Sequence, residues 1–313
     1  MPKSSTRSSP AKRLKRPQPP APQRPDTAAL QPLFVAGRGN VGRTLARALN
    51  AAGHRARLLP ARRGIRSLAR ALESSPHAIV FLAVPDDAVL TVAGVLARAG
   101  RRIPDTVAFV HLSGALPLAA LSPLEGRHPI GSFHPLQSFP EPRPPASMRG
   151  IVVAVDASSL ALERRLGRLA RALGARPRHV GDRERVLYHA AAVFASNYIV
   201  ALLREAVNLL QAAGWSRTEA TAGLLALAEG TLASVSKRGV VAALTGPVRR
   251  GDVNTVQRHL VGLSSLPEAV PYRMLGLIAL EIAVQAGLEP AAAGRMRRAL
   301  TAKAAATRRR RRT

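Results

Sequence analysis

The feature that most constrains this chain is a run of glycines at residues 37–42, which reads G-R-G-N-V-G and fits the pattern G-x-G-x-x-G. An apolar run, residues 32–36, comes directly before it, and residues 41–52 follow with helical spacing. A strand, this motif and a helix in that order are typical of the first turn of a dinucleotide-binding unit. The first glycine permits a tight turn, the second lets the backbone approach a pyrophosphate, and the third lets helix and strand pack closely. The residues predicted to bind the dinucleotide here are Gly37, Gly39, Asn40, Val41 and Gly42.

Strand and helix patterns continue to alternate after the motif. Residues 78–84 are continuously apolar, as in a parallel strand that is covered on both faces, and residues 107–111 repeat that pattern. A helix is predicted around residues 88–99 between them. This alternation predicts βαβ units and a mostly parallel sheet of the Rossmann type. The predicted strands after the first are residues 57–59, 78–84, 107–111, 151–155 and 176–180.

The strand patterns stop near residue 182. From there a single long apolar helix is predicted to residue 213, followed by helices at residues 216–236 and 266–286. The predicted fold class is therefore α/β, an N-terminal Rossmann-type sheet followed by an all-helical domain. We expect the Rossmann domain over residues 32–160, with a sheet that could extend to residue 180, and the helical domain over residues 161–290.

The two ends of the chain carry much of its positive charge. Of the net charge of +29, residues 1–31 hold +6 and residues 295–313 hold +9. Residues 1–31 are rich in Ser, Pro and Arg and are predicted to be disordered, while residues 291–313 are predicted to be an Arg-rich tail. We expect weak, salt-sensitive binding of polyanions by these ends. Aromatic residues are 3% of the chain, which disfavours a stacking platform for nucleic acid within the fold.

Other classes of protein are excluded by composition. The chain has no cysteine, so it has neither a disulfide framework nor a thiolate metal site, and no metal site is predicted. It has no run of 18 apolar residues, and no apolar stretch follows the basic residues at its N-terminus. We therefore expect no membrane span, no secretory signal and a cytoplasmic location.

The type of dinucleotide is indicated by the residues after the second strand. In proteins that bind NAD an acidic residue there bonds the ribose 2′-hydroxyl, whereas arginine suits the 2′-phosphate of NADP. About twenty residues beyond Gly42 this chain has Arg62 and Arg63 and no carboxylate. We therefore expect NADP, with NAD as the alternative if these arginines form only a solvated basic loop.

Small and polar residues stand at the ends of three further strands. Ligands of open α/β sheets bind in the crevice outside the carboxyl ends of the strands. Val84, Pro85 and Ser113 are placed there and are predicted to contact the cofactor. His134 lies in the run S-F-H-P-L-Q and is a candidate contact for the substrate, although a histidine at a strand end can equally be structural.

The long helix carries three polar groups in an apolar setting. His189 and Ser196 are seven residues apart and nearly eclipse at about 100° per residue, and Asn197 lies about 80° round from His189. We expect His189 to donate or accept a proton, Asn197 to orient the substrate, and Ser196 to make a second contact. The alternative is a satisfied network of helix packing.

A turn-rich segment interrupts the helical half at residues 244–252. Asp252 is expected to cap a helix in which Asp252, Thr255 and His259 share a face. A loop with two glycines, arginine and a capped helix can receive an anionic group, and the alternative is an ordinary helix connection. The residues predicted to bind substrate are Thr245, Gly246, Pro247, Arg250 and Asp252.

Taken in order, the motifs G-x-G-x-x-G, VPDD, HLSGAL, GSFHPLQSF, YHAAAVFASNY and LTGPVRRGD resemble a bacterial family over residues 32–290. The family pairs a Rossmann-like domain with the domain of unknown function 2520. It is related to ketopantoate reductase, prephenate dehydrogenase, pyrroline-carboxylate reductase and the β-hydroxyacid dehydrogenases. The resemblance implies nucleotide-dependent oxidoreduction without an assigned substrate. It also implies a helical domain of the 6-phosphogluconate-dehydrogenase C-terminal type that commonly forms a homodimer.

One departure from the related enzymes bears on the reaction. The β-hydroxyacid dehydrogenases carry a catalytic lysine four residues before an asparagine, and if Asn197 matches that asparagine, Val193 stands in place of the lysine. His189 is then the available substitute. The leading hypothesis is an NADP-dependent oxidoreductase acting on a small anionic carbonyl, imine or hydroxy compound. The alternative is a sensor or scaffold that binds NAD(P) without catalysis.

Overall fold

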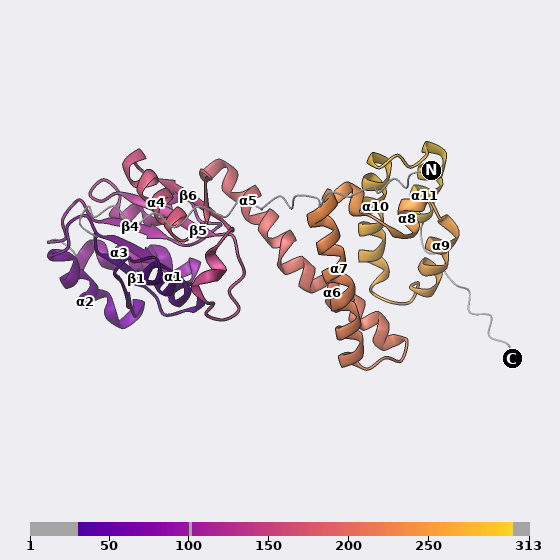
Figure 1. Ribbon diagram of the computed structural model, residues 1–313, viewed down its shortest axis with the longest axis horizontal. Helices are drawn as coiled ribbons and strands as arrows, with labels where there is room; N and C mark the ends of the chain where they lie inside the picture. Colours follow the sequence, from indigo (N-terminus) through magenta and orange to yellow (C-terminus); the bar gives the residue numbers. More distant parts are fainter. Residues whose placement is uncertain (1–30, 100–101, 303–313) are drawn as a thin grey trace, which may run out of the picture. The chain divides into compact units, whose positions relative to one another are not determined.

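The computed structural model describes residues 31–99 and 102–302 and divides into two compact units along the chain, Met1–Ala190 and Ala191–Thr313. The first unit holds the whole sheet, and the second is helical (Figure 1). The expected fold class, a mostly parallel Rossmann-type sheet followed by a helical region, is thereby confirmed. The expected tail at residues 1–31 lies outside the described residues except for Gln31.

The sheet has seven strands in the order β2-β1-β3-β4-β5-β6-β7. The first five run parallel to one another, β6 is antiparallel to β5, and β7 is parallel to β6. The expected extension of the sheet towards residue 180 is observed in β7. The strands are β1 Leu33–Ala36, β2 Ala56–Leu59, β3 Ile79–Leu82, β4 Ala108–His111, β5 Ile130–Pro135, β6 Val152–Ala157 and β7 Arg176–His179.

Helices cover both faces of this sheet, which is why the inner strands read as continuous apolar runs. On β3, Ile79 and Phe81 pack with α1 and α4, whereas Val80 and Leu82 pack with α2 and α3. Adjacent residues of a strand face opposite sides, so each residue of an inner strand enters one of two cores. The helices of this unit are α1 Asn40–Ala51, α2 Ala61–Glu73, α3 Asp86–Ala99, α4 Leu160–Ala172 and α5 Asp182–Ala195, with short 3-10 turns η1 Leu118–Leu124 and η2 Pro145–Met148.

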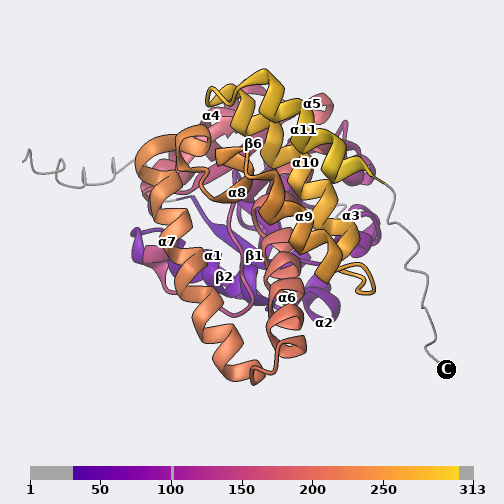
Figure 2. The ribbon, with the colours of Figure 1, turned by 90° about the vertical axis from the view of Figure 1, so that its right-hand side faces the viewer.

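The second unit is built from helices that follow α5. Its α6 and α7 form a hairpin, seen in Figures 1 and 2. A small apolar core joins the later helices through Val256, Leu260, Leu280, Met296 and Leu300. The helices are α6 Asn197–Ala212, α7 Arg217–Ala243, α8 Gly246–Arg250, α9 Val253–Gly262, α10 Ala269–Gln285 and α11 Pro290–Thr301.

Two expectations for the helical half are corrected. The long helix expected from residue 182 to residue 213 is interrupted at Ser196, whose backbone (φ −127°, ψ −73°) is not helical. The expected tail does not begin at residue 291, because residues 290–301 form α11. Met296 and Leu300 of α11 are buried, and Arg273 of α10 donates a hydrogen bond of 2.8 Å to the carbonyl of Leu300.

The two helices on either side of Ser196 also bear on the membrane question. Among the described residues, the stretch Asp182–Ala212 is long and apolar enough to cross a membrane by length and composition alone. A single stretch of this kind is weak evidence, since helices of soluble proteins pass the same test. The expected absence of a membrane span stays a prediction.

Candidate active site

The sheet has a topological switch point between β1 and β3, at the carboxyl ends of the parallel strands. From β1 the chain moves first to β2 on one side and then to β3 on the other, so β1 and β3 are neighbours at a point where the winding reverses. Open α/β sheets bind ligands at such a point. The loops that follow β1, β3, β4 and β5 all open at this edge, and they contain five of the residues that were predicted for the site: Gly37, Gly39, Val84, Pro85 and Ser113.

The glycine loop after β1 has the geometry that its three glycines predict. Gly37 has φ +133°, and a Cβ there would lie 2.0 Å from the carbonyl oxygen of Ala83. A Cβ on Gly42 would lie 2.1 Å from the carbonyl oxygen of Gly37. A Cβ on Gly39, in contrast, would have no atom of another residue within 4 Å beyond its chain neighbours. Two glycines are therefore required by packing, whereas the third leaves open space at the start of α1.

The N-terminus of α1 faces this open space. No side chain caps the helix, and its first turn contains no acidic residue. Free N–H groups and the helix dipole favour an anion at such an end. Asn40 and Val41 form the first turn, and the amide of Asn40 donates to the carbonyl oxygens of Phe139 and Pro140 at 3.0 and 2.8 Å. The side chain of Asn40 thus anchors the loop after β5, and its backbone N–H faces the N-terminal end.

Basic residues border the same loop, and two of them were not singled out in the sequence. Arg38 and Arg43 are exposed on either side of Gly39, and Arg43 Nε donates to the carbonyl of Arg38 at 2.8 Å. Arg38 occupies a variable position of the glycine motif, and Arg43 directly follows its last glycine. Arg62 and Arg63 follow β2 and belong to the first turn of α2, so the loop considered as the alternative is not observed. Their side chains lie outside the described part of the structure.

The loops after β3 and β4 are tied to each other by a serine. Ser113 Oγ donates to Asp86 Oδ2 at 2.7 Å and accepts from the backbone N–H groups of Ala115 and Leu116, both at 3.1 Å. The hydroxyl that was predicted to contact the cofactor is therefore engaged in holding these loops. Val84 and Pro85 lead from β3 into α3 at the same edge.

Three aromatic side chains meet beside the end of β5. The Nδ1 atom of His134 lies 2.7 Å from the hydroxyl of Tyr188 on α5, and the rings of His134 and His189 have centroids 6.4 Å apart. The His134 ring lies against the backbone at Gly114, where a Cβ would be 2.8 Å from it. The structure thus brings together His134 and His189, two residues predicted for catalysis from distant parts of the sequence. It adds Tyr188, which the sequence did not distinguish.

Burial sets the charge of this cluster. Burial, with a smaller contribution from His189 and Arg185, lowers the pKa of His134 to about 4. Burial also raises the pKa of Tyr188 to about 12. At neutral pH both partners of the 2.7 Å hydrogen bond are therefore uncharged. His134 is therefore a neutral imidazole, which can accept a proton but is not the imidazolium cation.

A buried arginine lies beneath the cluster and was missed in the sequence. Arg185 of α5 is 1% exposed, and it donates to Ser132 Oγ at 2.9 Å, to Asp156 Oδ2 at 3.3 Å and to the carbonyl of Val180 at 3.1 Å. Its partners lie on β5, on β6 and at the end of β7. Since Tyr188 follows Arg185 by about one helical turn, this anchor fixes the part of α5 that faces His134.

The remaining predicted residues belong to the second unit. Ser196 precedes α6 and Asn197 begins it, so the stripe expected to join them to His189 on one continuous helix is wrong. Ser and Asn bond readily to nearby backbone groups and favour helix ends over helix interiors, which accounts for a break at this pair.

The segment at residues 245–252 contains the short helix α8, with Thr245 at its N-cap and Gly251 at its C-cap. Thr245 precedes α8, Gly246 and Gly251 have positive φ, and Pro247 lies in the first turn. Asp252 accepts from the N–H of Thr255 at 3.0 Å, so the expected helix cap is observed. Arg250 is exposed at the end of α8. The expected role of this segment in substrate binding stays a prediction.

The chain is similar to one protein family and to several solved structures. The family model of the domain of unknown function 2520 matches residues 151–279, from β6 to most of α10. A Bacteroides fragilis protein, described provisionally as an NADP oxidoreductase, is 25% identical, with 81% of this chain and 98% of that one covered at a TM-score of 0.60. No curated protein matches the chain.

Two further solved structures share the fold. The Thermotoga maritima protein TM1727 is 24% identical, with 81% of this chain and 99% of that one covered and a TM-score of 0.63. Pyrroline carboxylate reductase from Plasmodium falciparum, solved with NADP bound, is 14% identical, with 87% and 99% covered and a TM-score of 0.53. The fold and the glycine loop define a Rossmann-type protein with a helical second unit. The family resemblance expected from the motifs is confirmed by this match, in which residues 151–279 are similar to the domain of unknown function 2520.

Proposed function

We propose that this protein is an NADP-dependent oxidoreductase that transfers a hydride to or from a small anionic carbonyl, imine or hydroxy compound. One observation carries the proposal: the open space at Gly39 and the His134 cluster lie at the same edge of the sheet. At this edge the strand order reverses and the N-terminus of α1 is uncapped. The glycine loop would hold the pyrophosphate, and the cluster would supply proton transfer.

The choice of NADP rests on the basic residues around the glycine loop. Arg62 and Arg63 follow β2 where an acid would select NAD, and α2 has no acidic residue in its first turn. The Bacteroides fragilis relative is described as an NADP oxidoreductase, and the Plasmodium falciparum reductase was solved with NADP. NAD is the alternative, because the fold binds either dinucleotide.

Within the cluster, we assign the proton that accompanies hydride transfer to His189. His134 is uncharged at neutral pH and is engaged by Tyr188, so it suits the role of a base or an orienting group. His189 is half-buried beside it and remains accessible. With a substrate in hand, His189→Gln is expected to lower kcat by roughly 10²–10⁴-fold and leave NADPH affinity unchanged. Normal turnover in that variant would move the role to His134.

The helical unit would supply substrate contacts and a subunit interface. Asn197 and Ser196 are proposed to orient the substrate, and the segment at residues 245–252 to receive its anionic group. Homodimerisation is supported by apolar side chains that α6 and α7 leave exposed, since large exposed apolar patches mark interaction surfaces. Examples are Val200 at 68%, Leu227 at 68% and Leu232 at 53% exposure.

Substitution of Gly39 tests the cofactor site directly. Gly39 has an ordinary φ of −68°, and a Cβ there would have no atom within 4 Å beyond its chain neighbours, so Gly39→Val should fold with nearly unchanged stability. The valine would occupy the space proposed for the pyrophosphate. Titration by NADPH fluorescence is expected to show at least a tenfold loss of affinity, with the midpoint of thermal unfolding almost unaltered.

The same titration compares the two dinucleotides. Arg62→Glu and Arg63→Glu are expected to lower the preference for NADPH over NADH, because a carboxylate repels the 2′-phosphate. Arg66→Glu, an exposed residue one turn further along α2, is the control. NADPH binding that survives Gly39→Val would reject the site, and an unchanged preference in both arginine variants would reject the choice of NADP.

A sensor or scaffold that binds NADP without catalysis is the second candidate. It is favoured by Val193, an apolar residue of α5 at the position where the related enzymes are expected to have lysine. Tight NADPH binding without turnover on a panel of small keto acids, imines and hydroxy acids would favour this alternative.

A further inference from the structure

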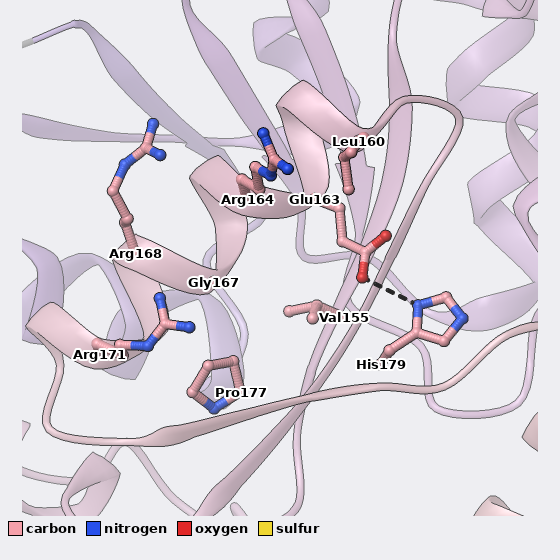
Figure 3. A pocket seen from close by; sticks show the side chains of 9 residues that line it. All are labelled: Val155, Leu160, Glu163, Arg164, Gly167, Arg168, Arg171, Pro177 and His179. Atoms are coloured by element: carbon pink, nitrogen blue, oxygen red, sulfur yellow. Dashed lines mark hydrogen bonds and ion pairs between the residues drawn. The ribbon is translucent and has the colours of Figure 1, made fainter.

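A second cavity lies on the face of the sheet opposite His134, between α4 and strands β6 and β7. Val155 in its floor pairs with Phe133, whereas the neighbouring Asp156 pairs with Ser132 and faces Arg185 on the other side. The cavity has a volume of about 310 Å³ (Figure 3). Its lining comprises Val155, Leu160, Glu163, Arg164, Gly167, Arg168, Arg171, Pro177 and His179.

Three arginines of α4 line one side of this cavity, and none of them forms an ion pair with a described carboxylate. Arg164, Arg168 and Arg171 recur at helical spacing on one side of α4 and make no ion pair or hydrogen bond with another described side chain. Like charges at such spacing destabilise a helix, by about 0.2–0.5 kcal/mol a pair. The positive charge also acts on Arg165, whose pKa is lowered to about 10, first by burial and then by Arg168.

The carboxylate that lines the cavity pairs with a histidine and not with these arginines. Glu163 lies in the first turn of α4, and its Oε1 is 3.1 Å from Nδ1 of His179 on β7. Figure 3 shows this pair at one end of the cavity, away from Arg168 and Arg171. The cavity thus has a basic side and an end where a carboxylate is already paired.

Gly167, in the middle of α4, has no side chain to fill the cavity. A Cβ on Gly167 would meet Arg171 and Pro177 at 3.6–3.9 Å, which is ordinary contact, so packing does not require glycine there. Val155 and Pro177 provide apolar surface beside it. A larger side chain at Gly167 would instead occupy the cavity.

We propose that this cavity binds a small molecule bearing a phosphoryl group, with Arg164, Arg168 and Arg171 holding the phosphate. Arginine presents a planar fork of donors that matches phosphate oxygens, and three such groups fit a ligand with at least two negative charges. The volume lies at the lower end of the range for small-molecule sites, and the apolar floor suits the remainder of such a ligand. The site is separate from the glycine loop, which lies at the carboxyl ends of β1 and β3.

Calorimetric titration of the full chain with pyrophosphate tests the proposal. We expect the double variant Arg168→Gln/Arg171→Gln to bind pyrophosphate at least tenfold more weakly than the parent. The control is Arg66→Gln/Arg70→Gln, which removes the same charge from exposed positions of α2. Each titration is repeated with saturating NADPH, which would occupy the glycine loop. If NADPH does not bind, the two double variants can still be compared for their affinity for pyrophosphate, because each is measured against the same parent.

Two further arms separate a built site from general attraction to a basic protein. Gly167→Leu keeps every arginine and fills the cavity, so it should also abolish the binding. Citrate, a trianion at neutral pH without a phosphoryl group, should bind more weakly than pyrophosphate. Equal losses in the two double variants, full binding by a folded Gly167→Leu protein, or tighter binding of citrate would each overturn the proposal.

Discussion

His111 and His134 lie on neighbouring strands of the sheet, on the face that Arg185 also occupies. His111 is fully buried, and burial with a smaller contribution from Arg185 lowers its pKa to about 4, as burial and His189 do for His134. A histidine in the unfolded chain takes up a proton near pH 6.5. Both side chains are therefore neutral in the folded protein over a range of pH in which the unfolded chain would be charged.

This difference predicts a loss of stability in mild acid. Because the unfolded state binds more protons below pH 6.5, the free energy of unfolding should fall as pH decreases from 6.5 towards 4, by on the order of 2–3 kcal/mol for each histidine. His134→Gln removes one of the two groups, so its thermal midpoint should depend less steeply on pH between 6.5 and 4.5. Parallel pH profiles for the parent and the variant would contradict the lowered pKa.

At the residue scale, local patterns predicted some of the site and not the rest. Gly37 and Gly42 were predictable because each requirement arises within a strand, a turn and a helix that are contiguous in sequence. Tyr188 was not, because its partner His134 lies 54 residues away and only the paths of β5 and α5 bring them together. Ser113 was placed at the correct edge, but its hydrogen bond to Asp86 depends on two different loops.

At the scale of elements, Arg185 joins α5 to the sheet. Its guanidinium bonds Ser132 on β5 and Asp156 on β6, and Asp156 is itself buried enough for its pKa to be raised. Removal of one partner of a buried ion pair leaves an uncompensated charge, which costs about 3–5 kcal/mol. Replacement of both partners by apolar residues is often close to neutral.

A double-variant cycle should show this coupling. Arg185→Met is expected to lower the free energy of unfolding by about 3–5 kcal/mol, and Arg185→Met/Asp156→Leu to recover most of that loss. Unfolding in urea, followed by circular dichroism, measures Arg185→Met, Asp156→Leu and the double variant against the parent. Additive losses would mean that Arg185 and Asp156 act independently, and would remove the anchor assigned to α5.

The elements themselves were predicted unevenly. The inner strands were clear because burial on both faces favours apolar residues at every position, as in β3 and in β4 up to His111. The break at Ser196 was missed because the apolar pattern continues across it and a single residue with non-helical backbone leaves no periodic signal. Helix α11 was mistaken for a tail because three arginines dominate its sequence pattern. Its two core residues, Met296 and Leu300, stand among them and give too weak an apolar signal.

For the whole molecule, the helix α11 changes how the charge is divided. Arg295, Arg297 and Arg298 belong to α11, so the positive segments outside the described helices and strands are residues 1–30 and 303–313. Each of these carries +6, which leaves +17 of the net +29 on the part between them. Part of that remainder lies on α4, around the cavity assigned to a phosphoryl ligand.

Removal of both terminal segments should separate general polyanion binding from binding of the cofactor. A chain of residues 31–302 keeps α11 intact and is expected to lose most retention on heparin at moderate salt, because binding through Lys and Arg falls steeply as salt rises and as contacts are removed. Its affinity for NADPH, measured by fluorescence titration, should stay within about twofold of the parent, since the glycine loop is untouched. A chain of residues 31–290, which also lacks α11, is the comparison and should be destabilised, because Met296 and Leu300 leave the core of the second unit. If residues 31–302 still bound DNA tightly and with little dependence on salt, polyanion binding would have to be assigned to the folded units instead.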